Sequence, residues 1–288
     1  MEGELWKGLY HLVSCQAKLH SHPKGVQYSD ALILLVFFWA VLHDRPLSWA
    51  CQIRNWPAEA RWLQVPAGST MSRRLASLSL ITLLTAVLAV LRTAQPSLCR
   101  RIDSKPLPVG GLGKDRDARW GYATGGKARG YKLCCAWGLS VVPDAICLGP
   151  LNLADSQAAW QVIQQLHGGG YLLADATHDC NPLFQQAGEL GFQLLAPRKK
   201  PFTHLGHRQH NAWRLRSMQL LEGPGEFGPS LYRSREDIER NYGQLTSFGG
   251  GLQPLPSWVR HPRRVVLWVA AKLVINAVRI QRNQALAA

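Results

Sequence analysis

The run GGYLLADAT, residues 169–177, decides the fold class, because it is a short apolar segment with glycines before it and an acid near its end. An apolar run of this length is typical of a strand buried inside a sheet. Residues 154–167 before it have the period of a helix, and residues 181–190 after it form a second helical segment. Another apolar run follows at residues 191–197. Helices that alternate with strands in this way indicate an α/β domain.

Three further strands are predicted upstream of this run. Residues 100–109 alternate in the manner of a strand, and strand-like runs return at residues 130–142 and 144–151. A glycine-rich basic loop separates the first of these strands from the other two. We therefore expect one α/β domain over residues 99–288, which ends in a basic helix from about residue 261.

Residues 1–98 are predicted to be all helical, since they contain long leucine-rich runs and no strand alternation. Within them, residues 46–56 and 65–78 predict a helix, a connection and a second helix. This is the outline of a helix-turn-helix whose second helix enters a major groove of DNA. A plain helical hairpin is the alternative. The candidate capping residues and DNA contacts of the second helix are Ser69, Thr70, Arg73 and Arg74.

The charge of the chain indicates a polyanionic partner. Thirty-three Lys and Arg residues against eighteen Asp and Glu residues leave a net charge of +15, spread along 288 residues without a charged tail. DNA is the natural partner for such an excess. Attraction to an anionic membrane is the alternative for a basic protein.

Two apolar runs bear on the membrane alternative, and the cysteines bear on the compartment. Residues 32–42 and 75–91 are shorter than the roughly 20 apolar residues that cross a bilayer, and the second run contains two Ser and two Thr residues. We therefore expect buried core helices and no membrane partner. The seven cysteines are an odd number without a C-x-x-C pair, which indicates free thiols in a reducing compartment, the cytoplasm.

The segment LYRSREDIERNYGQL, residues 231–245, is predicted to be an amphipathic helix. Its apolar face consists of Leu231, Ile238, Tyr242 and Leu245, while Arg233, Asp237, Arg240 and Gln244 point away. A further stripe lies at the rim of the apolar face and consists of Tyr232, Arg235, Glu239 and Thr246. The simplest interpretation of this stripe is a surface Arg–Glu pair four residues apart, which stabilises a helix by roughly 0.3 kcal/mol.

Three acids from distant parts of the chain suggest a different role for that stripe. Asp103 lies within a strand-like run, where a charged residue is disfavoured unless it faces a site. Asp175 stands at the carboxyl end of a buried strand, where α/β folds place ligands. With Glu239 they provide three hard oxygen donors, which suit Mg²⁺ or Mn²⁺. Two such ions can catalyse displacement at a phosphodiester.

Four blocks of the sequence resemble the catalytic blocks of bacterial DDE insertion-sequence transposases. The blocks are RRIDSKPLPV, DRDARWGYATGGKARGYKL, LLADATHD and YRSREDIERNYGQL, in this order. The resemblance covers roughly residues 99–280. The last block is the most specific one, because Tyr232, Arg235 and Glu239 reproduce the Y-x2-R-x3-E signature of one large branch of that class.

The resemblance implies a ribonuclease H-like catalytic domain behind an all-α DNA-binding region. It implies that Asp103, Asp175 and Glu239 are catalytic and hold two Mg²⁺ or Mn²⁺ ions. Arg235 and Tyr232 would contact the DNA backbone near the cut. Relatives work as dimers on paired DNA ends, so a homodimer is implied as well.

The chain departs from the pattern of that branch at two places. Thr246 stands where the branch has a Lys seven residues after the Glu, so that phosphate contact is missing or comes from elsewhere. His178 stands where relatives often have an aromatic residue. Asp179 is a rival of Asp175 for the second metal position, although a helix-capping role ahead of residue 181 suits it better.

Residues 197–230 form a basic segment where some relatives carry an insertion that handles the flanking strand. Lys199, Lys200 and Trp213 are its candidate DNA contacts, since cations with an interleaved aromatic suit backbone neutralisation and base stacking. The alternative is a solvated basic loop with Trp213 in the core.

The sequence thus predicts a DNA transposase that binds the terminal inverted repeats of an insertion sequence and acts on target DNA. Metal-activated water would cut the strand, and the freed 3′ hydroxyl would join it to the target. Two alternatives stay open. One is a metal-dependent nuclease or resolvase without strand transfer, and the other is a catalytically decayed repressor that only binds DNA. In each case the protein would act in the prokaryotic cytoplasm, at the nucleoid.

Overall fold

The chain forms two compact units, one of which is made from both ends of the sequence. One unit comprises residues 1–92 and 244–288, and the other comprises residues 93–243. The C-terminal helix is therefore grouped with the N-terminal helices, which differs from the predicted domain of residues 99–288. The structure, a computed structural model, describes residues 2–20, 25–92, 97–110, 115–201, 205, 210–249, 251–252 and 254–287.

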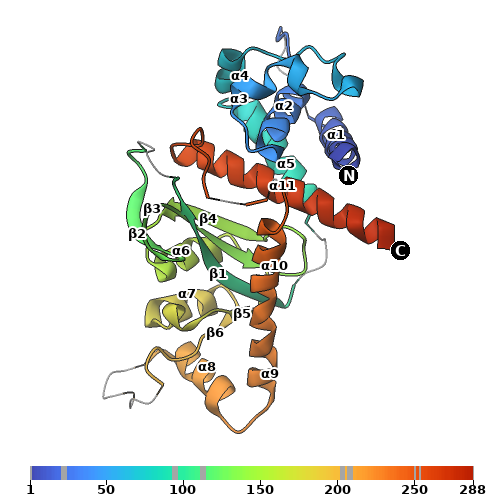
Figure 1. Ribbon diagram of the computed structural model, residues 1–288. Coiled ribbons are helices and arrows are strands. Elements are labelled where there is room, and N and C mark those ends of the chain that lie inside the picture. The colour runs from blue at the N-terminus through green and yellow to red at the C-terminus, as the bar shows by residue number, and fades with distance from the viewer. Residues whose placement is uncertain are drawn as a thin grey trace. The chain divides into compact units, whose positions relative to one another are not determined.

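The unit of residues 93–243 is built on a mixed sheet, which has six strands in the part that the structure describes (Figure 1). The strand order is β2-β3-β1-β5-β6, and β4 also pairs with β3. β1 is antiparallel to β3 and parallel to β5, which in turn is parallel to β6. The strands are β1 (Cys99–Pro108), β2 (Arg119–Ala123), β3 (Gly126–Trp137), β4 (Ala145–Pro150), β5 (Gly170–Leu173) and β6 (Phe192–Leu195).

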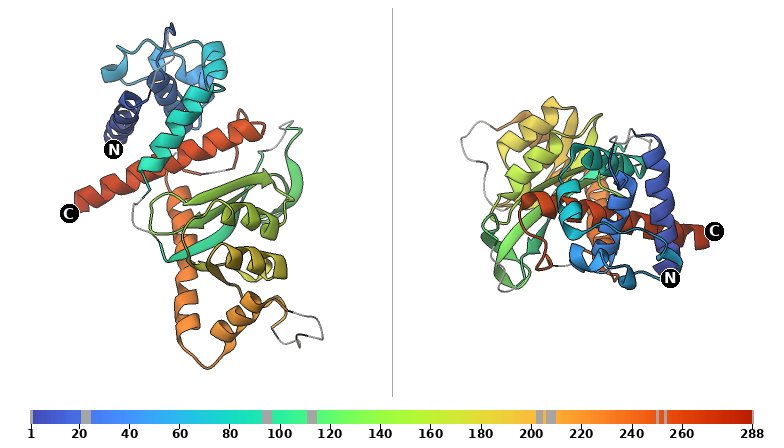
Figure 2. Two further views of the ribbon diagram at one scale, coloured as in Figure 1. Left: turned by 180° about the vertical axis from the view of Figure 1, so that it is seen from behind. Right: turned by 90° about the horizontal axis from the view of Figure 1, so that it is seen from above.

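Two helices cover one face of this sheet. They are α6 (Asp155–Ile163) and α7 (Asn181–Glu189), seen in yellow-green and yellow in Figure 2. Their apolar side chains share a core with Ile102 of β1 and Cys134 of β3. The predicted order of three strands, a helix, a strand, a helix and a strand is confirmed, but β2 was expected to be a loop.

The opposite face of the sheet contacts the predicted amphipathic helix. It consists of α9 (Phe227–Arg233), a 3₁₀ turn and α10 (Asp237–Thr246), which follow one another in line in Figure 1. Tyr242 is buried, donates a hydrogen bond to the Asp103 carbonyl over 3.0 Å and packs edge-on against Trp137. The apolar face is thus confirmed. Asp237 does not point away as predicted, because it pairs with Arg101 of β1 at 2.6 Å.

The helical unit has a long helix at its centre. α11 packs against α1, α2 and α5, and its middle section from about Leu267 to Val278 is buried. The helix predicted to be basic is therefore a core helix. Even Lys272 is buried, where its ammonium donates to Asp44 at 2.7 Å. The helices are α1 (Glu2–Lys18), α2 (Asp30–Leu42), α3 (Leu47–Ala50), α4 (Gly68–Arg74), α5 (Leu78–Val90) and α11 (Pro262–Ala287), and α8 (Ala212–Glu222) belongs to the other unit.

The predicted helix-turn-helix is not formed as outlined. Its first helix is only the four-residue α3, followed by two 3₁₀ turns. Its second helix, α4, begins at Gly68 after Ala67, so neither Ser69 nor Thr70 occupies the cap position. Aromatic packing explains the short first helix, since Trp49 stacks with Trp39, 6.3 Å between ring centroids, and holds the segment against α2.

Two further predictions concern the apolar helices and the cysteines. No single helix in the described residues is long and apolar enough to cross a membrane, although α4 and α5 reach that length together across a 73° bend. All seven cysteines are free thiols.

Candidate carboxylate site on β1 and β5

The register of the parallel strands brings Asp103 and Asp175 side by side. Arg101 of β1 pairs with Leu173 of β5, and both chains continue for two residues to the two acids. Neighbouring strands lie about 4.8 Å apart, so the two Cα atoms occupy adjacent positions. Each carboxylate influences the other electrostatically, since the charge of Asp175 raises the pKa of Asp103. Two acids 72 positions apart in sequence therefore form one site.

Asp175 is held in place by the turn that follows it. Its Oδ1 accepts hydrogen bonds from the backbone N–H and the hydroxyl of Thr177 and contacts Nδ1 of His178 at 2.7 Å. Burial by itself raises the pKa of Asp175, but these hydrogen bonds outweigh it and hold the pKa well below its ordinary value. The carboxyl group is thus ionised and oriented at neutral pH.

Asp103 is in a less favourable environment for its charge. Burial raises its pKa, which the Ser104 backbone N–H and the nearby Arg235 offset only in part. The hydrogen bonds of both acids use Oδ1, so the Oδ2 atoms are left without a partner among the described residues. Two adjacent carboxylates with one uncommitted oxygen each fit a divalent cation, which prefers oxygen ligands and would relieve their repulsion.

Glu239 lies at the edge of this site and not inside it. Its side chain is 68% exposed, and its Oε1 lies 3.8 Å from the guanidinium of Arg235. Arg235 in turn interacts with Asp103, so it links Glu239 to the other two acids. Ligand atoms of Asp103, Asp175 and Glu239 are not gathered within 4.8 Å of one another in the described structure.

Tyr232 fixes the position of the helix column, which consists of α9, the 3₁₀ turn and α10. Its hydroxyl already donates a hydrogen bond within the protein. The acceptor is the carbonyl of Ala174, at 3.0 Å, immediately before Asp175. Burial raises the pKa of its phenol, and Arg235 lowers it in part. In the structure the Tyr232 hydroxyl thus ties α9 to the end of β5, whereas its contact with a DNA backbone stays a prediction.

Asp179 has a structural role that removes it as a rival of Asp175. Both of its carboxylate oxygens accept from the guanidinium of Arg214 on α8, at 2.7 and 2.9 Å. Its carboxylate also accepts from the backbone N–H of Lys199. The predicted helix cap is wrong, since the cap residue of α7 is Cys180.

The basic insertion is only partly available for DNA. Lys199 and Lys200 are exposed, as predicted for DNA contacts. Trp213 instead packs its indole on Gly188 of α7, where an added Cβ would lie 2.2 Å from the ring. It also borders the core of the sheet, which favours the core interpretation over base stacking.

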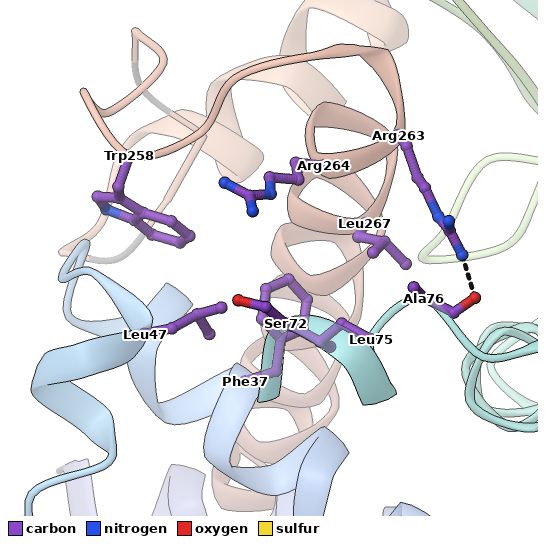
Figure 3. Close-up of a pocket in the computed structure, with 9 residues that line it drawn as sticks. All are labelled: Phe37, Leu47, Ser72, Leu75, Ala76, Trp258, Arg263, Arg264 and Leu267. Atoms are coloured by element: carbon purple, nitrogen blue, oxygen red, sulfur yellow. Dashed lines mark hydrogen bonds between the residues drawn. The ribbon is translucent and has the colours of Figure 1, made fainter. Parts of the chain in front are cut away.

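In the helical unit, the two predicted arginines have different environments. Arg74 is 11% exposed and donates to Asp30 at 2.6 Å and to the Tyr28 carbonyl, which favours a structural role over the predicted DNA contact. Arg73 is exposed. The same unit contains a pocket of about 360 Å³, lined by apolar residues of α2, α3 and α11, by Ser72 of α4 with the two residues that follow α4, and by Trp258. Figure 3 shows the guanidinium of Arg264 inside this pocket, whereas Arg263 turns away to the Ala76 carbonyl.

Lys105 was missed in the sequence although a simple signal marks it. It stands two residues after Asp103 on β1 and therefore on the same face of the sheet. Its ammonium lies 5.7 Å from the Tyr242 ring centroid, and burial lowers its pKa while Asp103 raises it. Strand periodicity around Asp103 was sufficient to find it. The contacts of Thr177 and His178 with Asp175 depend on the geometry of the turn, which sequence periodicity does not predict.

Comparison with known proteins identifies the family of the chain. The family model described as "Transposase DDE domain" matches residues 95–273, which is more than half of the chain and includes all three acids. Neither the curated proteins nor the solved structures contain a match. The chain belongs to the family of transposases with a DDE domain.

Proposed function

We propose that this protein is the transposase of a bacterial insertion sequence, from the branch with the Y-x2-R-x3-E signature, and that Asp103, Asp175 and Glu239 are its catalytic metal ligands. It binds the element ends and catalyses strand cleavage and strand transfer. The adjacent register of Asp103 and Asp175 on β1 and β5 is the observation that supports this most. The family match supports the class of enzyme.

The catalytic domain is proposed to be ribonuclease H-like. β1 and β4, which are each antiparallel to β3, and β3 itself precede a helix, a parallel strand, a second helix and a last parallel strand. The first acid lies on the central strand and the second at the carboxyl end of its parallel neighbour. This arrangement supports the proposal because carboxyl ends of parallel strands converge where α/β folds place their ligands.

When bound, two Mg²⁺ or Mn²⁺ ions would lower the pKa of an attacking water and offset charge on the scissile phosphate. Asp103 and Asp175 would hold them through their uncommitted oxygens. Glu239 completes the ligand set by turning inward from its exposed position on α10. The Thr177 and His178 contacts keep the Asp175 carboxylate ionised and pointing at the site.

The two proposed steps are in-line displacements at phosphorus. In cleavage, a water oxygen bonds to phosphorus while the bond to the 3′ oxygen breaks, and that oxygen leaves as a hydroxyl. In transfer, the same hydroxyl attacks a target phosphate and releases the target's 3′ oxygen. No covalent intermediate with the protein is needed, since the carboxylates act only as ligands.

Two cations on the site face are proposed to hold the phosphates. Arg235 is close enough to Asp103 to affect its pKa. Lys105 projects from the same strand face as Asp103 and supplies the phosphate contact for which the branch uses a Lys at the position of Thr246. Both lie where a scissile phosphate would meet the carboxylates.

Recognition of the element ends is assigned to the helical unit. Arg73 is exposed on α4, the guanidinium of Arg264 lies in the pocket of the same unit (Figure 3), and both cations are proposed to contact a DNA backbone. Lys199 and Lys200 are assigned to the flanking strand. The protein would work as a homodimer on paired ends, in the cytoplasm at the nucleoid.

The test is metal-dependent cleavage and strand transfer on labelled DNA from the margins that flank its own gene. Wild-type protein is compared with Glu239→Gln, which keeps the shape of the side chain and removes its charge. We expect Glu239→Gln to bind DNA and to lose both activities by more than about 100-fold. Glu236→Gln is the matched control, because Glu236 is an exposed acid three residues earlier in the same helix column.

Other outcomes identify the alternatives. Equal activity of wild type and Glu239→Gln would refute the assignment of Glu239. Cleavage of branched DNA that lacks terminal repeats, without joining, would identify a resolvase. Sequence-specific binding without cleavage by the wild-type protein would identify a decayed repressor.

A further inference from the structure

The hairpin of β2 and β3 carries two large aromatic side chains in solvent. Trp120 is 66% exposed and Tyr122 is 77% exposed, although aromatic residues are usually well buried. Both lie on β2, an edge strand of the sheet. Two exposed rings next to each other on an edge strand mark a binding surface.

The backbone determines which way these rings point. Gly121 lies between them, and a Cβ at this glycine would be only 2.6 Å from the Leu151 carbonyl oxygen. Gly121 therefore faces the segment after β4, and the side chains of Trp120 and Tyr122 point to the other face of the sheet.

The strand register shows that this other face is the one that carries Asp103. Trp120 pairs with Arg129 of β3, and Asp103 pairs with Cys135 of the same strand. Both pairings keep a constant offset, and Arg129 and Cys135 are an even number of residues apart, so they share a face. The two rings thus extend the face of the carboxylate site.

The charge around the rings favours a nucleic acid over a protein partner. Residues 119–129 contain three cations and no acid. Lys127 is exposed and lies directly opposite Tyr122. Arg129 is committed to the backbone carbonyls of Asp115 and Ala118, which anchors the hairpin.

The spacing of the rings fits one base. Residues two apart on a strand are about 7 Å apart, which is twice the roughly 3.4 Å stacking distance of bases. A base inside a duplex already has a neighbour on each side. Only an unpaired base can therefore enter between two rings.

We propose that the β2–β3 hairpin holds an unpaired nucleotide of the DNA strand that is cut at the carboxylate site. Its base lies between Trp120 and Tyr122, and its phosphate lies on Lys127. The proposal rests on the proposed function for the identity of the strand. Trp120 lies opposite Arg129, which is six residues along β3 from Cys135, the partner of Asp103. That length is about 20 Å, or about six base steps, so the nucleotide is about six positions from the cut.

The test measures binding of a labelled single-stranded 20-mer and of its duplex by fluorescence anisotropy, in EDTA, so that cleavage is not needed. Trp120→Ala and Tyr122→Ala should each weaken single-strand binding roughly 5-fold or more, while duplex binding changes less than about 2-fold. Trp120→Phe keeps a ring and should retain most of the affinity. Lys127→Gln should lower the salt slope of single-strand binding by about 0.7.

Trp160→Ala is the matched control, because Trp160 is 38% exposed on α6, which covers the opposite face of the sheet. Equal losses for single strand and duplex, or the same loss in Trp160→Ala, would overturn the proposal. So would a Trp120→Ala variant that binds normally but changes from dimer to monomer in light scattering.

A second measurement separates this proposal from the proposed function. A partial duplex carries 2-aminopurine at one unpaired position after another, and stacking on the rings quenches its fluorescence. Quenching at about the sixth position that is lost in Trp120→Ala supports the hairpin site. If quenching occurs but the wild-type protein never cleaves, the proposed function fails and the binding site stands.

Discussion

Asp103 is a residue whose charge destabilises the folded protein. Its pKa lies above the ordinary value of 3.8 because of burial, so the folded state keeps the proton to higher pH than the unfolded chain does. Stability from this carboxyl group therefore falls as pH rises through the window above 3.8. This cost remains in the metal-free protein at neutral pH.

We expect Asp103→Asn to raise the free energy of unfolding of the metal-free protein at pH 7. The difference from wild type should shrink as pH is lowered toward 4, because the carboxyl group then becomes neutral as well. Urea unfolding at several pH values in EDTA measures this. With saturating Mg²⁺ the order should reverse, since only the wild type gains binding energy. A less stable Asp103→Asn protein in EDTA would contradict the prediction.

Asp175 and Asp179 can be distinguished by what their loss does. Asp179 is 8% exposed and pairs with Arg214 through both oxygens, so Asp179→Ala leaves a largely buried guanidinium without its carboxylate partner. We expect a loss of about 3–5 kcal/mol in the free energy of unfolding. Asp175→Asn should also lower the stability, because the Thr177 and His178 contacts favour its charged form, but only Asp175→Asn should bind Mg²⁺ weakly. Urea unfolding and calorimetric metal titration test both, and a reversed pattern would make Asp179 the ligand.

At the scale of the element, the apolar stripe of α10 stabilises the fold more than the exposed ion pair within the helix does. Ile238 is fully buried, whereas the Arg240 side chain is 75% exposed in its pair with Asp237. We expect Ile238→Ala to lower the free energy of unfolding by about 2–4 kcal/mol. Arg240→Ala should cost less than about 0.5 kcal/mol. Denaturant unfolding of the two variants compares them, and similar losses would show that the ion pair matters.

The helix column of α9, the 3₁₀ turn and α10 is fixed to the carboxylate site on both sides of the 3₁₀ turn. Tyr232 on one side of the turn binds the Ala174 carbonyl, and Tyr242 on the other side binds the Asp103 carbonyl. The column is therefore tied to the strand ends beside both acids. Arg235 lies in the turn itself and is thereby directed toward the carboxylates.

At the scale of the whole molecule, the helical unit depends on residues from both ends of the chain. The middle of α11 is buried against α1, α2 and α5. A chain shortened after Gly243 should lose cooperative unfolding of the N-terminal helices, because their apolar faces lose that partner. Circular dichroism and hydrogen exchange in α2 measure this. Removal of residues after Arg282, where α11 is mostly exposed, is the control and should leave protection unchanged.

The amino-acid sequence by itself determined the features that depend on local period and composition. Apolar runs and helical periods located five of the six described strands and the helices between them. Tyr232, Arg235 and Glu239 lie in one predicted helix, so their spacing is visible in the sequence alone. The missed strand, β2, has both of its large side chains in solvent and no buried alternation, so no periodic signal marked it.

Only the tertiary structure decided which residues meet. Strand register placed Asp103 beside Asp175, and it placed Trp120 on the same face, because pairing across a sheet depends on contacts far apart in sequence. The partners of Arg74, Asp179 and Trp213 were likewise decided by packing, which took these residues out of the set predicted to bind DNA or metal. The sequence does not distinguish a charged or aromatic side chain that is buried against a partner from one that is exposed. Only the tertiary structure distinguishes these two environments.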